Sequence, residues 1–238
     1  MAELKAGGSN ELLTRLFPGM EVTPDAGYQM ALEFDCDRVG GAGGEEFLNK
    51  ISDLKRHSLG GPMDKAFTAL SAKRSEGMPI VKIDYRKNES IFVCPAVAKV
   101  VVIFLVDFED TTDKALARVF LQEFVEAQRV VRTAPPVSYS ALPPGELASL
   151  SFPYSSECVG FISFALEERH VAGARAAAAV TLLTGFRNYL HYHIKCSKTY
   201  LHMRMRKRVA GWLQVLNRAV PEVETEKKTA AGKSFVRK

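Results

Sequence analysis

Residues 174–217 read ARAAAAVTLLTGFRNYLHYHIKCSKTYLHMRMRKRVAGWLQVLN and contain no proline. The alanine-rich start, residues 174–180, has high intrinsic helix propensity. The stretch therefore predicts one continuous helix, which at 1.5 Å per residue would be about 65 Å long. Because that is roughly twice the width of a small domain, part of the helix is expected to project or to lie across a partner.

The apolar residues of this helix recur in steps of seven and four, at Leu183, Leu190, Ile194, Leu201, Met205, Trp212 and Leu216. An eleven-residue repeat keeps such residues on one side of a nearly straight helix. One small domain cannot cover a stripe of this length, so we expect the first half to pack on the chain's own sheet and the rest on a partner. The following residues are predicted to lie at a subunit interface or in the chain's own core: Leu190, Ile194, Leu201, Met205 and Trp212.

Positive charge is concentrated in the same segment. Residues 170–221 hold nine Lys or Arg and no acid, whereas the remainder holds 23 basic and 27 acidic residues and is net negative. An uncompensated basic segment indicates an acidic partner, which leaves nucleic acid, membrane lipid or an acidic protein surface open. The longest apolar run, VVVIFLV at residues 100–106, is too short to cross a bilayer. No membrane is expected among the partners.

The remainder of the chain mixes strand and helix signals. Strands are predicted at residues 28–34, 80–85, 90–94, 99–108, 137–140 and 159–166, with a hairpin turn at residues 87–89. Helices are predicted at residues 11–17, 45–56, 63–74 and 113–129, the second and third separated by Gly60, Gly61 and Pro62. This predicts an α+β fold with a domain boundary after residue 78 and a second domain, residues 79–238, that ends in the long helix and a polar tail.

Sites for chemistry are not predicted. The four cysteines are widely scattered, which is typical of reduced thiols in the cytosol. His191 and His202 would lie about 16 Å apart on a helix, too far to share a metal ion. Since no nucleophile elbow, catalytic triad or phosphate loop occurs, the chain is expected to be no enzyme and to hold no cofactor and no metal.

Residues 186–198, FRNYLHYHIKCSK, followed by YLHMRMR at 200–206, closely resemble the family of subunit 2 of the actin-related protein 2/3 complex, its 34 kDa subunit. The resemblance continues through VLNRA at 215–219, EKKT at 226–229 and GKSF at 232–235. It also includes VFLQEF at 119–124 and TAP at 133–135, and it is weaker before Gly77. It therefore covers essentially the whole chain.

The resemblance implies two α/β sandwich-like domains with mixed or antiparallel sheets, the second ending in the long helix. Family members carry further strands before the segment similar to residues 11–17, so residues 1–78 are expected to form an N-terminally incomplete first domain. The helix would pair with the long helix of subunit 4 and contact the acidic side of the mother actin filament, in a cytoplasmic, cytoskeletal assembly that nucleates branches.

The candidate actin-binding residues are Phe186, Arg187, Lys195, Lys198, Arg204 and Arg206. The alternative function is nucleic-acid binding by the same basic helix. No nucleic-acid-binding motif occurs, however, and the apolar stripe calls for a protein neighbour, so a nucleic-acid partner is not expected.

Overall fold

The computed structural model describes residues 7–28, 30–37, 43–128, 130–131 and 133–219. By internal contacts the chain divides into two compact units, with the boundary between Lys195 and Cys196. The predicted tail after residue 219 lies outside the described residues, and the predicted domain boundary after residue 78 stays a prediction.

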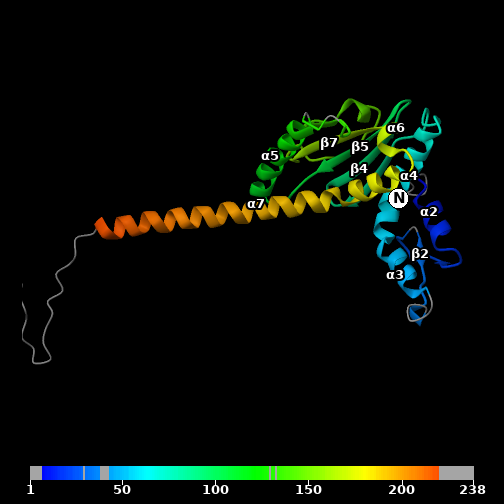
Figure 1. The fold of residues 1–238 in the computed structure, drawn as a ribbon, viewed down its shortest axis with the longest axis horizontal. Helices are drawn as coiled ribbons and strands as arrows, with labels where there is room; N and C mark the ends of the chain where they lie inside the picture. The colour runs from blue at the N-terminus through cyan, green and yellow to red at the C-terminus, as the bar shows by residue number, and fades with distance from the viewer. Residues whose placement is uncertain (1–6, 29, 38–42, 129, 132, 220–238) are drawn as a thin grey trace, which may run out of the picture. The chain divides into compact units, whose positions relative to one another are not determined.

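A five-stranded sheet forms the centre of the first unit (Figure 1). Its strand order is β3-β4-β5-β7-β6, and every neighbouring pair is antiparallel. The strands are β3 (Val81–Arg86), β4 (Glu89–Pro95), β5 (Lys99–Val106), β6 (Val137–Ser140) and β7 (Gly160–Glu167). Asn88, at φ 63°, makes the predicted β3–β4 turn in the left-handed conformation that asparagine tolerates. Together with the helices, this sheet confirms the α+β class.

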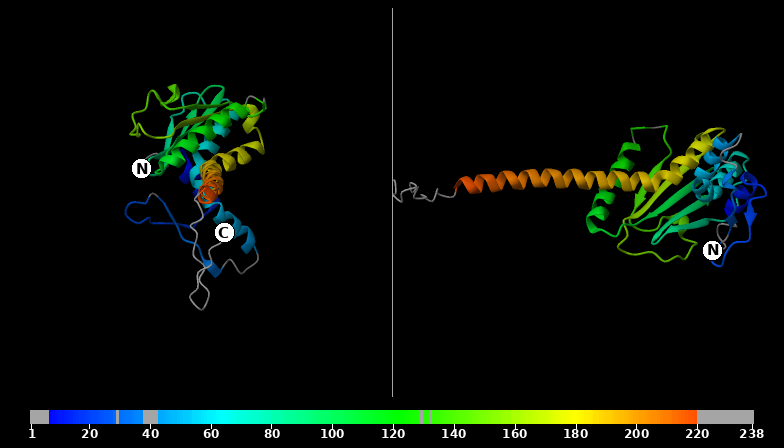
Figure 2. Two further views of the ribbon diagram at one scale, coloured as in Figure 1. Left: turned by 90° about the vertical axis from the view of Figure 1, so that its left-hand side faces the viewer. Right: turned by 90° about the horizontal axis from the view of Figure 1, so that it is seen from below.

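Both faces of the sheet are covered, which explains the continuous apolar run of β5. Val100, Val102 and Phe104 face α5 (Thr111–Gln128) and the first half of α7 (Arg175–Ala219). Figure 2 shows these helices on one side of the sheet. On the opposite face, Val101 and Ile103 pack in a second cluster with residues of the segment between β6 and β7, which includes η2 (Gly145–Leu147).

The N-terminal elements are α2 (Ser9–Leu16), the short antiparallel pair β1 (Glu21–Val22) and β2 (Ala31–Leu32), α3 (Gly44–Ser52) and α4 (Leu54–Ser71). The predicted strand at residues 28–34 is reduced to β2 among its described residues. Helix α4 packs on α2 and on the sheet, and α6 (Glu168–Val171) follows β7.

The predicted helix break at Gly60, Gly61 and Pro62 is wrong, because α4 runs through all three residues. Close packing explains the outcome. A Cβ on Gly60 would lie 2.4 Å from Cγ1 of Val180 in α7, and one on Gly61 would lie 2.6 Å from Cα of Ser9 in α2. The glycines thus allow two helices to approach α4, and this packing overrides their low helix propensity.

Candidate protein-interaction surface on helix α7

Helix α7 is 45 residues long and confirms the predicted long C-terminal helix. We call residues 175–195 its root and residues 196–219 its outer half, following the boundary between the two compact units. The helix's buried residues, Val180, Leu183, Phe186, Leu190 and Ile194, all belong to the root. The two parts of one regular helix therefore have different surroundings, and they are considered in turn.

The root packs in the core of the first unit. The ring of Phe186 lies 5.0 Å from that of Phe104 and 5.1 Å from that of Phe164, and only 7% of the residue is exposed. Leu190 and Ile194 are 0% and 1% exposed. Phe186, a candidate filament contact, is therefore a core residue. Leu190 and Ile194 also belong to the chain's own core, so neither offers its side chain to another subunit.

Two of the candidate filament-binding cations are paired within the first unit. The Nε of Arg187 donates to both carboxylate oxygens of Glu89, at 3.2 and 3.1 Å, and the Glu89 side chain is 4% exposed. Burial raises the pKa of the Glu89 carboxyl, and the charge of Arg187 opposes that shift. Lys195 Nζ donates to Oδ2 of Asp113, whose side chain is 2% exposed. The position of Arg187 near the apolar stripe indicates that it needs a carboxylate or another acceptor if buried, but neither partner could be identified from the sequence, because the partners lie 98 and 82 residues away in the chain.

The outer half has the opposite character. Every residue from Thr199 to Ala219 is exposed, including Leu201 at 40%, Met205 at 60% and Trp212 at 66%. At about 100° per residue, Leu201, Met205, Val209, Trp212, Leu213, Val215 and Leu216 share an arc of about 160°. Such an arc is wider than the apolar stripe of a typical surface helix. An exposed apolar arc of this width indicates that a neighbouring protein covers it.

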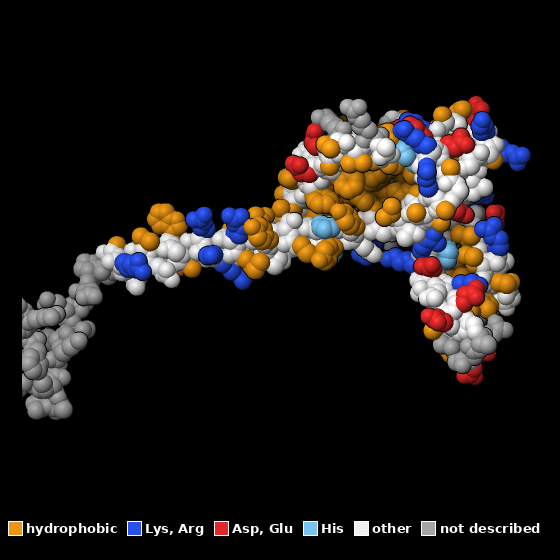
Figure 3. Space-filling view, in the orientation of Figure 1, with side chains coloured by type: hydrophobic (Ala, Val, Ile, Leu, Met, Phe, Trp, Pro, Cys, Tyr) orange, Lys and Arg blue, Asp and Glu red, His pale blue; other side chains and the backbone are white. Residues whose placement is uncertain are grey.

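Basic side chains accompany this apolar arc (Figure 3). Helical geometry places Arg204 beyond one edge of the arc and Arg206 beyond the other. Lys198 is half-buried, whereas Arg204 is exposed, with its guanidinium 5.6 Å from the centre of the Tyr200 ring and 3.1 Å from the Tyr200 hydroxyl. The outer half contains no acid, so it combines an apolar surface with positive charge, at Arg204 and Arg206 on the flanks and at Arg208 within the arc.

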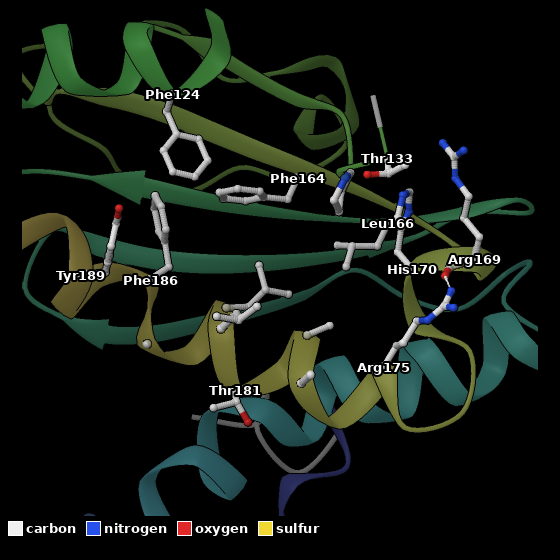
Figure 4. Close-up of a pocket in the computed structure, with 16 residues that line it drawn as sticks. Phe124, Thr133, Phe164, Leu166, Arg169, His170, Arg175, Thr181, Phe186 and Tyr189 are labelled. Carbon is white, nitrogen blue, oxygen red and sulfur yellow. Dashed lines mark hydrogen bonds between the residues drawn. The ribbon is translucent and has the colours of Figure 1, made fainter. Parts of the chain in front are cut away.

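An apolar groove lies beside the root, between α7 and α5 (Figure 4). Its volume is about 920 Å³. The rings of Phe124, Phe164 and Phe186 line one part of it, and Arg169 and Arg175 lie at the other end. Figure 3 shows the same region as a hollow of apolar side chains. The sequence did not predict this groove, because its walls come from α5, β7, α6 and α7.

The described residues hold no cluster of three or more His, Cys, Asp or Glu side chains placed to bind a metal ion. None of the helices within the described ranges is long and apolar enough to span a bilayer. Among the described residues, the apolar arc, its basic flanks and the groove are the candidate surfaces for interaction.

An exposed apolar arc with basic groups beside it is typical of a protein that assembles with others through a long helix. The family model described as "Arp2/3 complex, 34 kD subunit p34-Arc" matches residues 1–223. The chain belongs to this family.

Two curated relatives carry the name actin-related protein 2/3 complex subunit 2. The protein of Schizosaccharomyces pombe is 38% identical over 256 residues, covering 99% of this chain and 81% of its own length. The protein of Dictyostelium discoideum is 37% identical over 239 residues, covering 98% of this chain and 80% of its own. These relatives agree with the resemblance that the sequence motifs indicated.

Proposed function

We propose that the chain is a structural subunit of the actin-related protein 2/3 complex that contacts the mother actin filament and supports branched nucleation. Its role is to bind and position other proteins, without chemistry of its own, in the cytoplasmic actin cytoskeleton. The observation that carries the proposal is the outer half of α7, where an apolar arc and basic flanks are exposed together.

The apolar arc is assigned to a partner within the complex. Leu201, Met205 and Trp212 present large apolar side chains on one side of a helix, as required for packing against a second helix. Subunit 4, the sibling expected from the family resemblance, is the proposed donor of that helix. The apolar groove beside the root offers a further surface of the same kind. Other subunits of the complex would extend these contacts.

The basic flanks are assigned to the filament. Arg204 and Arg206 lie in a segment without acids, so an acidic actin surface is a complementary partner. Lys198 is half-buried and lies in line with the apolar arc, so it is kept only as the candidate that the sequence indicated. Arg187 and Lys195 are set apart from it, because both already have carboxylate partners in the first unit.

The test is co-sedimentation of the reconstituted complex with actin filaments. The double variant Arg204→Glu/Arg206→Glu should weaken filament binding by about tenfold or more at low salt, since it replaces two attractive charges by repulsive ones. Arg15→Glu/Lys55→Glu is the matched control, because both residues are exposed on N-terminal helices and the change in net charge is the same.

Assembly of each variant complex is verified first by gel filtration. Filament binding that is unchanged in the Arg204→Glu/Arg206→Glu complex would rule out this surface as the filament contact. Salt-dependent binding of the chain to nucleic acid, in the absence of filament binding, would instead favour the alternative function.

A further inference from the structure

Three side chains spaced four residues apart form a line along the root of α7. They are Arg187, His191 and Lys195, and they face the segment around Phe108, between β5 and α5. The Arg187 guanidinium lies 5.4 Å from the centre of the Phe108 ring, and the His191 ring stacks on the same ring at 6.1 Å and 5°. Charge pairs to Glu89 and Asp113 lie at the two ends of this line.

The two carboxylates that pair with α7, those of Glu89 and Asp113, are held in place by the sheet and by α5. Glu89 is the first residue of β4 and pairs in the sheet with Arg86. Asp113 lies in the first turn of α5, and its amide donates to Oδ1 of Asp110 at 3.0 Å. Lys114 binds Asp107 at 3.0 Å across the same segment. The helix therefore meets two anchored carboxylates, both almost completely buried.

Apolar packing and ion pairs constrain a helix differently. The contacts of Leu183, Leu190 and Ile194 are non-directional, and similar burial can be reached after a small rotation or slide. A buried carboxylate, in contrast, requires its cation at hydrogen-bonding distance, because leaving either charge unpaired is unfavourable. In some proteins, buried polar or charged groups of this kind specify register although they add little stability.

We propose that Glu89 and Asp113 are positioning residues, which fix the rotation of the α7 root about its own axis through Arg187 and Lys195. The two cations thus serve the chain itself and not an external acidic surface. A rotation of the root turns all of its side chains by the same angle, so these pairs determine which residues of the root stay exposed to a filament or a sibling subunit. This inference rests on the proposed function.

The test is a double-mutant cycle in the reconstituted complex, using Glu89→Gln, Arg187→Gln and the double variant. Each single change leaves one buried charge without its partner, whereas the double variant removes both charges and keeps amide groups that can bond to each other. We expect each single variant to bind filaments about fivefold or more weaker than the unmodified complex, and the double variant to recover to within about threefold. Melting temperatures should follow the same order.

Several outcomes would overturn the inference. If Arg187 touches the filament directly, Arg187→Gln and the double variant will be equally weak while Glu89→Gln binds normally. If the melting temperatures change but filament affinities do not, the pair is merely structural. Where a single variant fails to assemble, a double variant that assembles and binds supports the inference, and one that also fails contradicts it.

The Arg204→Glu/Arg206→Glu complex separates this inference from the proposed function. Normal filament binding by that complex refutes the proposed contact surface. If that complex is impaired but the Glu89 and Arg187 cycle shows no recovery, only the positioning role is refuted.

Discussion

Replacing Leu190 by alanine should destabilise the isolated chain strongly, because its side chain is fully buried in the core at the root of α7. Removing its three terminal carbon atoms loses about 2 kcal/mol of hydrophobic transfer free energy, and the cavity adds to this. We therefore expect a loss of about 3 kcal/mol in the free energy of unfolding. For a chain of this size that lowers the melting temperature by about 6–12 °C.

Leu201→Ala is the matched comparison, since it makes the same chemical change eleven residues further along the same helix. Leu201 is 40% exposed, so its truncation should change the free energy of unfolding by no more than about 0.5 kcal/mol. Urea or thermal unfolding of the full chain, followed by circular dichroism, measures both values. Equal destabilisation by the two variants would refute the division of α7 into a packed root and an exposed outer half.

Three further predictions, two for substitutions and one for cysteine labelling, test other parts of the structure. Gly60→Ala should lower the free energy of unfolding by about 1–3 kcal/mol, because the new Cβ would clash with Val180, and an unchanged melting temperature would contradict this packing. Burial lowers the pKa of His170, so the folded state disfavours protonation and the free energy of unfolding should fall as the pH drops below about 6.5. The variant His170→Gln should make this dependence on pH weaker in thermal melts at several pH values. The same dependence in the variant and in the unmodified chain would exclude His170 as a contributor. Burial raises the pKa of Cys94 to about 12, so a thiol-alkylating reagent at pH 8 should label exposed Cys196 much faster than Cys94. Mass spectrometry measures both rates, and equal rates would contradict the prediction.

Sequence patterns predicted the sheet well, because strand signals are local. The strand expected at residues 137–140 coincides with β6, and the run at 99–108 contains β5. The prediction of a helix break in α4 was wrong because the decisive contacts are not local. The sequence around Gly60 and Gly61 is compatible with either a break or a continuous helix, and only their contacts with α7 and α2 show that the glycines allow close helix packing.

The candidate site was predicted in outline but not in detail. Periodicity identified which side of α7 is apolar, but it carries no signal for where the chain's own core ends, at Ile194. Charge counting likewise placed Arg187 and Arg204 in one candidate set for filament binding, although Arg187 lies near the apolar stripe. They differ because Glu89, distant in sequence, lies against Arg187 and receives its hydrogen bonds. Such partners are set by topology and cannot be inferred from the spacing of residues in one helix.

We propose the outer half of α7 as a surface for partners, whereas the root belongs to the chain's own core. Hydrogen–deuterium exchange of the full chain, measured alone and in the reconstituted complex, tests it directly. Amides of residues 183–194 should be protected in both states, and those of residues 199–217 should exchange rapidly in the isolated chain and slow at least about tenfold in the complex. Protection of residues 199–217 that is the same with and without the other subunits would contradict the assignment of the outer half to partners.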